Sequence, residues 1–163
     1  MRQYRRRFAR RSTRLRGYDY ARAGAYFITL NAQDRLPLFG TVRDGAVELS
    51  AIGQIVAEEW ARTPELRPNV ALDAFVVMPD HFHAIVVIRQ RDPLASPVPQ
   101  PGELRSPART LGAVVRGFKG AVVRRVGFPI WQRNYHDSII RGGNGLFRVR
   151  RYIALNPARW EEQ

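Results

Sequence analysis

Residues 72–88 read LDAFVVMPDHFHAIVVI, and the fold expected for the whole chain is built around them. The run from Leu72 to Met78 is apolar and rich in β-branched residues, which predicts a strand. Pro79-Asp80 interrupts the run, and His81 to Ile88 forms the next predicted strand. Because both faces of this second strand are largely apolar, we expect it to lie centrally in a sheet.

The flanking sequence extends this pattern to an α+β fold. Before it, we predict a strand over 25–31, a hairpin over 39–49 that turns at Asp44-Gly45, and a helix over 51–62 capped by Ser50. After it, we predict an amphipathic helix over 111–126 and a strand over 130–141. A last helix is expected over 145–156, with Asn144 as its N-cap and its end before Pro157. This order predicts an antiparallel sheet with helices mainly on one face.

The composition excludes several classes of protein. A length of 163 residues is that of one domain, and 45% hydrophobic content excludes a disordered tail. The absence of cysteine excludes disulfide scaffolds, cysteine zinc sites and thiol catalysis. No apolar run approaches the roughly 20 residues of a membrane span. We expect a basic N-terminal arm over residues 1–20 and a single domain over 21–163, with a flexible Pro-rich loop at 89–108. A cytoplasmic protein without a membrane partner is expected.

The charge of the chain predicts a polyanionic partner. Lys and Arg number 27 and Asp and Glu 14, so the formal net charge is +13, and 26 of the basic residues are Arg. Residues 1–16 hold eight Arg and no acid, and residues 109–163 hold eleven basic residues against three acidic ones. Arginine forks onto phosphate and stacks on bases, so nucleic acid is the simplest partner.

Two histidines of the central strand form a candidate metal site. His81 and His83 are two residues apart, so they present two imidazoles on the same face of the strand. The alternative is a pair of half-exposed histidines without a ligand. Asp80 is expected to cap the turn after Pro79, although a carboxylate in that position can instead orient an imidazole.

The last predicted helix carries a candidate nucleophile. Tyr152 and Asn156 are four residues apart and share one helix face. A phenol oxygen can attack phosphorus when a nearby cation stabilises its anion, and an Asn carbonyl oxygen can bind a metal. The alternative for Tyr152 is a tyrosine at the edge of the core. In Tyr135-His136-Asp137, adjacent strand residues point to opposite faces, so His136 is kept only as a candidate supporting residue.

Three motifs together resemble the REP-associated tyrosine transposases, a branch of the single-tyrosine HUH transposases. They are PDHFH after the strand FVVMP, then WQRNYHDSIIR, then RYIALNP, and the resemblance runs from about Tyr26 to Trp160. It implies a ferredoxin-like antiparallel sheet of the HUH endonuclease type. It also implies that His81, His83 and Asn156 bind Mg²⁺ or Mn²⁺ and that Tyr152 is the catalytic nucleophile.

The activity implied by this resemblance is nicking and rejoining of single-stranded DNA at palindromic hairpins through a covalent 5′-phosphotyrosine. Basic residues near the motifs are expected to contact DNA: Arg116, Lys119, Arg124, Arg125, Arg133, Arg141, Arg148 and Arg151. The protein is expected to be a monomer or a homodimer. Two alternatives stay open: a non-cleaving protein of this fold that binds hairpin nucleic acid, and a nuclease that uses activated water, in which Tyr152 is structural.

Overall fold

A four-stranded antiparallel sheet organises the chain, and the histidine strand lies inside it as predicted. The computed structural model describes residues 18–20, 22–89 and 109–160. In chain order the elements are β1 (Gly24–Asn31), the 3₁₀ turn η1 (Gln33–Arg35), β2 (Gly40–Arg43), β3 (Ala46–Leu49), α1 (Ala51–Ala61), α2 (Thr63–Leu66), β4 (Val70–Val77), β5 (His81–Ile88), α3 (Leu111–Val126), β6 (His136–Ile140) and α4 (Gly142–Trp160). The sheet order is β4-β5-β1-β6, and β2 pairs with β3 in a separate hairpin.

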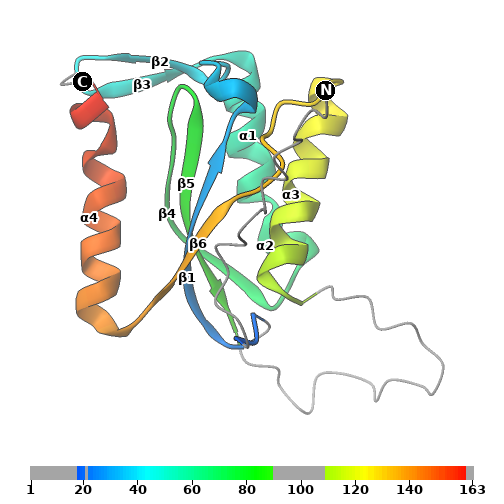
Figure 1. Cartoon of the computed structure of the whole chain (residues 1–163), viewed down its shortest axis with the longest axis vertical. Helices are drawn as coiled ribbons and strands as arrows, with labels where there is room; N and C mark the ends of the chain where they lie inside the picture. The colour runs from blue at the N-terminus through cyan, green and yellow to red at the C-terminus, as the bar shows by residue number, and fades with distance from the viewer. Residues whose placement is uncertain (1–17, 21, 90–108, 161–163) are drawn as a thin grey trace, which may run out of the picture.

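Helices cover both faces of this sheet (Figure 1). α1 connects β1 to β4 across β5, and α3 connects β5 to β6 across β1, so the fold consists of two split βαβ units. α1 and α3 pack side by side on one face, and α4 lies on the other. The expected ferredoxin-like α+β fold with helices mainly on one face is confirmed. The helix α4 lies on the opposite face.

Alternation along β5 separates the core from the histidines. Phe82 is fully buried, and its ring centroid lies 5.2 Å from that of Trp60 on α1 and 5.4 Å from that of Phe118 on α3. Successive strand residues point to opposite faces, so His81 and His83 project from the other side of the sheet. That is the side covered by α4.

Side-chain caps begin the two helices over the core, and the cap predicted at Ser50 is confirmed. Ser50 accepts a hydrogen bond from the Gly53 backbone amide at 3.0 Å, which starts α1 at Ala51. Thr110 caps α3 in the same way through Ala113 at 3.2 Å. Gly127, with φ of 90°, ends α3 in the left-handed conformation that favours glycine.

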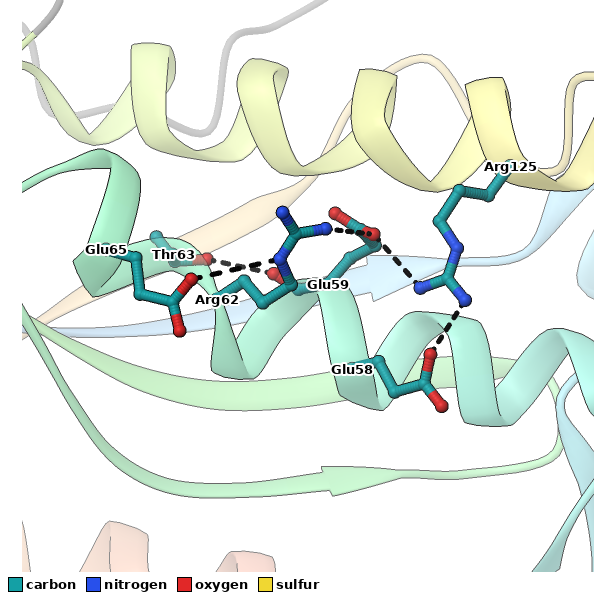
Figure 2. Close-up of polar contacts among 6 residues, drawn as sticks. All are labelled: Glu58, Glu59, Arg62, Thr63, Glu65 and Arg125. Carbon is teal, nitrogen blue, oxygen red and sulfur yellow. Dashed lines mark hydrogen bonds and ion pairs between the residues drawn. The ribbon is translucent and has the colours of Figure 1, made fainter.

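An ion-pair network joins α1 to α3 (Figure 2). Arg125 of α3 donates to Glu58 at 2.7 Å and to Glu59 at 3.0 Å, and Arg62 also contacts Glu59, at 3.3 Å. The Glu59 side chain is only 5% exposed, and a buried carboxylate needs charged or hydrogen-bonding partners. These contacts raise the pKa of Arg125 above its ordinary value. The network therefore fixes α3 against α1.

The last predicted strand is shorter in the structure than its apolar pattern indicates. β6 covers only residues 136–140, whereas the apolar pattern predicts a strand over 130–141. Trp131 instead forms an isolated bridge with Ala32. Between the bridge and β6, the carbonyl oxygens of Gln132 and Asn134 accept hydrogen bonds from Lys119. A side chain on α3 thus replaces the ladder partner that a continuous strand would use.

The last helix is longer than predicted at both ends. It begins at Gly142, so Asn144 is a residue of the helix rather than its N-cap, and it continues through Pro157 to Trp160. Proline removes one backbone donor, but tertiary packing supplies most of a helix's stability. Asn156 is buried, and the Trp160 ring lies 5.7 Å from that of His81. These contacts hold the last turn in place despite the proline.

Two predicted segments lie mostly outside the described residues. They are the N-terminal arm, described at 18–20 alone, and the Pro-rich loop, described at residue 89 alone. The rings of Tyr18 and Tyr20 lie 6.3 and 6.1 Å from that of Tyr26, so these two residues pack onto β1. Within the described ranges, no helix has both the length and the apolarity to cross a membrane.

Gly53 provides a test of the packing between α1 and the β2–β3 hairpin. A Cβ at this position would overlap the carbonyl oxygen of Phe39 and lie 3.2 Å from Leu49 Cδ2. We expect Gly53→Ala to lower the free energy of unfolding by about 2 kcal/mol, measured by urea denaturation. Gly143→Ala is the matched control, because nothing lies within 4 Å of a Cβ there and alanine favours a helix. Equal stability of the two variants would contradict the close contact.

Candidate functional site

His81 and His83 lie next to each other on the α4 side of the sheet. Their ring centroids are 4.6 Å apart, and the two residues are 7% and 5% exposed. The prediction that both imidazoles share one strand face is confirmed. The alternative of half-exposed histidines is wrong, because α4 covers this part of the sheet.

Each imidazole is oriented by a hydrogen bond at Nδ1. The Nδ1 atom of His81 lies 2.6 Å from Asp80 Oδ1, and that of His83 lies 2.8 Å from Thr29 Oγ1. The preferred expectation for Asp80 was therefore wrong, since its carboxylate holds an imidazole rather than only closing a turn. Its second oxygen pairs with Arg35 Nε at 2.9 Å. Nε2 is the ring nitrogen that these two contacts leave for a ligand.

The surroundings of both histidines favour the neutral imidazole over the charged form. Burial is the main cause that lowers the pKa of His83 to about 3, and the charges of His81 and Arg35 add to it. Burial also lowers the pKa of His81, against the opposing effect of Asp80. A neutral imidazole has a free lone pair on one nitrogen, which is the form that binds metal ions.

α4 presents Tyr152 and Asn156 to these rings, as their spacing predicts. The Tyr152 ring lies 5.4 Å from that of His83 and 5.9 Å from that of Phe27. Asn156, one turn later, is buried and hydrogen-bonded to His81. Tyr152 is 41% exposed, so its phenol is accessible from solvent while its ring rests on the sheet.

The four predicted residues line one cleft of about 450 Å³. Its walls also contain four residues that the sequence analysis did not identify: Thr29, Arg35, Arg159 and Trp160. Thr29 meets His83 through strand register, and Arg35 arrives from the turn after β1. No local pattern signals the contacts of Thr29 and Arg35, because each depends on two segments far apart in the sequence. Arg159 and Trp160 follow Asn156 by three and four residues on the same helix, which the sequence predicts to end before Pro157.

The donor atoms in the cleft fit a divalent metal ion. Two neutral imidazoles and an amide oxygen can bind such an ion and leave positions open for substrate. Across the described ranges, no group of three or more His, Cys, Asp or Glu side chains is arranged to hold a metal. A metal here would therefore depend on Asn156 in addition to the histidines.

A bidentate ion pair anchors α4 to the edge strand β4. Arg150 Nε donates to Asp73 Oδ1 at 2.8 Å, and Nη2 donates to Oδ2 at 2.6 Å. Asp73 lies where the pairing of β4 with β5 shifts register, between Leu72 and Phe75. The Arg150 contact holds the pKa of Asp73 below its ordinary value. Arg150 is two residues from Tyr152, so the pair sets the position of the tyrosine over the sheet.

We expect Asp73→Asn to loosen α4 while the sheet stays folded. The substitution conserves size but removes the charge that binds Arg150. Amide hydrogen exchange in α4 should accelerate about twofold to fivefold, with β1 and β5 unchanged. Because the folded pKa of Asp73 is depressed, its stabilisation is present at neutral pH and is lost as the pH falls through that pKa. Asp44→Asn, the same change in the β2–β3 turn, is the control, and identical exchange in both variants would argue against the anchor.

The basic residues expected to contact DNA lie on both sides of the sheet. Arg148 and Arg151 are exposed on α4, and Arg141 is exposed immediately before it. Arg133 is exposed in the segment before β6. Arg116 and Arg124 are exposed on α3, and α3 lies across the sheet from α4, the helix of Tyr152 (Figure 1). The exposed basic residues closest in sequence to Tyr152 are therefore those of α4.

Lys119 and Arg125 are engaged within the protein. Lys119 Nζ donates to the carbonyl oxygen of Gln132 at 2.7 Å, and burial lowers its pKa to about 8. Arg125 is held by Glu58 and Glu59 (Figure 2). His136 is exposed on β6 opposite Thr29 in the register, and it does not belong to the residues that line the cleft.

Comparison with known proteins found a related sequence and several solved structures of similar fold. No family model matches the chain. The chain is 35% identical to an uncharacterized protein of Haemophilus influenzae, over 94% of this chain and 91% of that protein. The fold is similar to that of a REP-associated tyrosine transposase bound to a REP hairpin, with a TM-score of 0.63 and 22% identity over 87% of this chain and 71% of the other. A Deinococcus radiodurans protein aligns with a TM-score of 0.44 and 20% identity, over 86% of this chain and 94% of its own.

Proposed function

The chain belongs to the same family as the Haemophilus influenzae protein and has the fold of a REP-associated tyrosine transposase, and from these premises we propose that it is a DNA-cleaving transposase. In the proposed reaction it nicks and rejoins single-stranded DNA at hairpin-forming repeats through a covalent 5′-phosphotyrosine. The structural neighbour holds a REP hairpin, which is the class of substrate proposed for this chain.

One observation carries the proposal, namely that Tyr152 stands beside the histidine pair in a single cleft. Its ring lies 5.4 Å from that of His83, and Asn156 on the same helix contacts His81. A nucleophile of this type needs a partner that stabilises negative charge nearby. The exposed phenol is the nucleophile of that arrangement, and the divalent ion that the buried imidazoles would hold is the partner that would stabilise its negative charge.

His81, His83 and Asn156 are the residues that would hold Mg²⁺ or Mn²⁺. When bound, the ion supplies positive charge that offsets the charge developing on the phosphate oxygens. Asp80 and Thr29 fix the two imidazole rings before any ligand arrives, so little reorganisation accompanies binding.

Tyr152 acts as the nucleophile of an in-line displacement at phosphorus. A bond forms between its Oη and phosphorus while the bond from phosphorus to the 3′ oxygen breaks. The electron pair leaves with the 3′ oxygen, which takes a proton from water, and the phenol proton passes to water. One phosphoester replaces another, so the step needs no ATP. A 3′-hydroxyl can reverse it and rejoin the DNA.

The exposed arginines around the cleft form the proposed DNA surface. Arg148 and Arg151 lie on α4 with Tyr152, Arg141 directly precedes that helix, and Arg133 precedes the strand that leads into α4. Arg116 and Arg124 would contact DNA that extends past the sheet. Each phosphate neutralised by such a residue releases counterions, so this binding weakens as salt increases.

A denaturing gel tests the proposed function. Wild-type protein is incubated with labelled single-stranded hairpin oligonucleotides taken from repeats of the genome that encodes it, with Mg²⁺ or Mn²⁺. The expected result is a protein-linked DNA band that a chelator prevents. Cleavage without such a band would identify water as the nucleophile. Hairpin binding without cleavage would identify a non-cleaving hairpin-binding protein, and either outcome overturns the proposal.

A further inference from the structure

Arg35 enters the cleft with part of its guanidinium already engaged. Its Nε pairs with Asp80 Oδ2 at 2.9 Å, and its Nη1 donates to Asn31 Oδ1 at 2.6 Å. Within the described residues, the third nitrogen, Nη2, makes no hydrogen bond. The side chain is 49% exposed. A guanidinium held by two of its nitrogens keeps a defined orientation and still offers donors to a ligand.

The backbone at this position is held in an unusual conformation. Asp34 and Arg35 have φ values of 52° and 56°, in the left-handed region that residues with side chains seldom adopt. Two such residues in succession come at a cost in free energy. In this conformation the Arg35 side chain contacts Asn31 of β1 and Asp80, which directly precedes β5. These two contacts hold the side chain in place.

The cleft carries a positive charge that matches a phosphodiester. Arg35 and Arg159 line it, and no acidic side chain belongs to the described residues of its wall. The nearby carboxylate of Asp80 is engaged on both oxygens, by His81 and by Arg35. Charge-assisted hydrogen bonds from arginine to phosphate are among the strongest in proteins.

We propose that Arg35 binds the same phosphate that Tyr152 attacks, through the guanidinium donors that Asp80 and Asn31 leave unused. This inference rests on the proposed function and adds a phosphate-binding residue to it. Arg35 thereby links the phosphate to the carboxylate that orients His81. The rival explanation is that Arg35 only holds Asp80 in place, and the test separates the two.

The test measures binding of DNA that carries one neutral linkage. Wild-type protein first forms the covalent adduct, which maps the cleaved linkage. Binding is then measured in chelator with Tyr152→Phe protein, so that no cleavage occurs. The hairpin oligonucleotide carries either an ordinary phosphate or a methylphosphonate at the mapped linkage. With Arg35 present, the methylphosphonate should weaken binding about tenfold. With Arg35→Gln added, both oligonucleotides should bind equally within about twofold.

Two further variants control for charge and for positioning. Arg43→Gln removes one exposed arginine from β2, where it pairs with Glu48, and should leave the methylphosphonate effect intact. Asp80→Asn keeps a side-chain oxygen for Arg35 and weakens the hold on His81, and it should also preserve the effect. If Asp80→Asn abolishes the effect as Arg35→Gln does, Arg35 acts only through Asp80 and the inference is overturned.

Failure of this inference can be told apart from failure of the proposed function. An adduct in the wild type together with an unchanged methylphosphonate effect in Arg35→Gln overturns the role of Arg35 and leaves the function standing. If the wild type forms no adduct, the proposed function fails first. In that case methylphosphonates are placed at each single-stranded linkage in turn. A linkage whose effect depends on Arg35 supports a phosphate site, and the absence of any such linkage overturns it.

Discussion

Tyr152→Phe is expected to abolish the covalent protein–DNA adduct and to reduce strand cleavage by at least about 1,000-fold. The phenol oxygen is the atom that forms the bond to phosphorus, and phenylalanine has no replacement for it. The ring that rests on His83 and Phe27 is retained. Within the described residues, no hydrogen bond to Tyr152 Oη is lost. The free energy of unfolding should therefore change by no more than about 0.5 kcal/mol.

Tyr135→Phe is the matched control for this substitution. Tyr135 precedes β6 in the motif Tyr135-His136-Asp137, and it packs against the hydrophobic core rather than lining the cleft. Its variant should form adduct at the wild-type rate within about twofold. The decisive measurement is the time course of the protein-linked band on a denaturing gel. An adduct formed by Tyr152→Phe would show that another residue is the nucleophile.

Local sequence patterns predict the secondary structure well where the residues at the element ends are distinctive. α3 has its predicted bounds because Thr110 and Gly127 supply a cap and a left-handed end. β5 has its predicted bounds because Pro79 and Asp80 separate it from the preceding strand. α4 departs from prediction because its burial against β5 outweighs the local effect of Pro157. That packing is absent from any short window of sequence.

In the candidate site, too, local sequence patterns predict some features, and contacts between distant segments determine the others. His81 with His83, and Tyr152 with Asn156, follow from spacing within one strand and one helix. The meeting of those two pairs depends on α4 crossing the sheet face opposite α1 and α3 (Figure 1). The contacts of Thr29, Arg35 and Asp80 depend on register and turn geometry, which residue types alone do not specify. The sequence alone therefore favours a simple turn at Asp80 over an orienting role.

The basic residues expected to contact DNA differ in their position relative to Tyr152, because some lie on each side of the sheet. Arg148 and Arg151 share a helix with Tyr152, so a DNA strand bound to them would lie near the phenol. Arg116 and Arg124 are separated from it by the sheet, and Arg125 serves the packing of α3 on α1. Charge alone cannot distinguish these roles, because every residue of this set is basic and most are exposed.

Loss of His83 is the second substitution with a large expected effect. His83→Ala removes an imidazole from the donor set, and affinity for Mn²⁺ should fall by at least about 100-fold. Metal-dependent cleavage should be lost with it, while hairpin binding in chelator stays within about threefold, because the exposed arginines are untouched. Titration calorimetry measures the metal, and gel shift measures the DNA. His83→Gln accompanies it, because a buried alanine leaves a cavity and the amide conserves more volume.

His136→Ala is the control for a histidine on the same face of the sheet. It is exposed, it lies opposite Thr29 in the register, and it does not line the cleft, so metal affinity and cleavage should match wild type within about twofold.

A pH series adds a second test. Because burial holds the pKa of both cleft histidines below the ordinary 6.5, Mn²⁺ affinity should change little as the pH falls from about 7.5 to 6.5. If folded His83→Ala protein cleaves DNA at the same metal concentration as the wild type, the histidine pair takes no part in the mechanism.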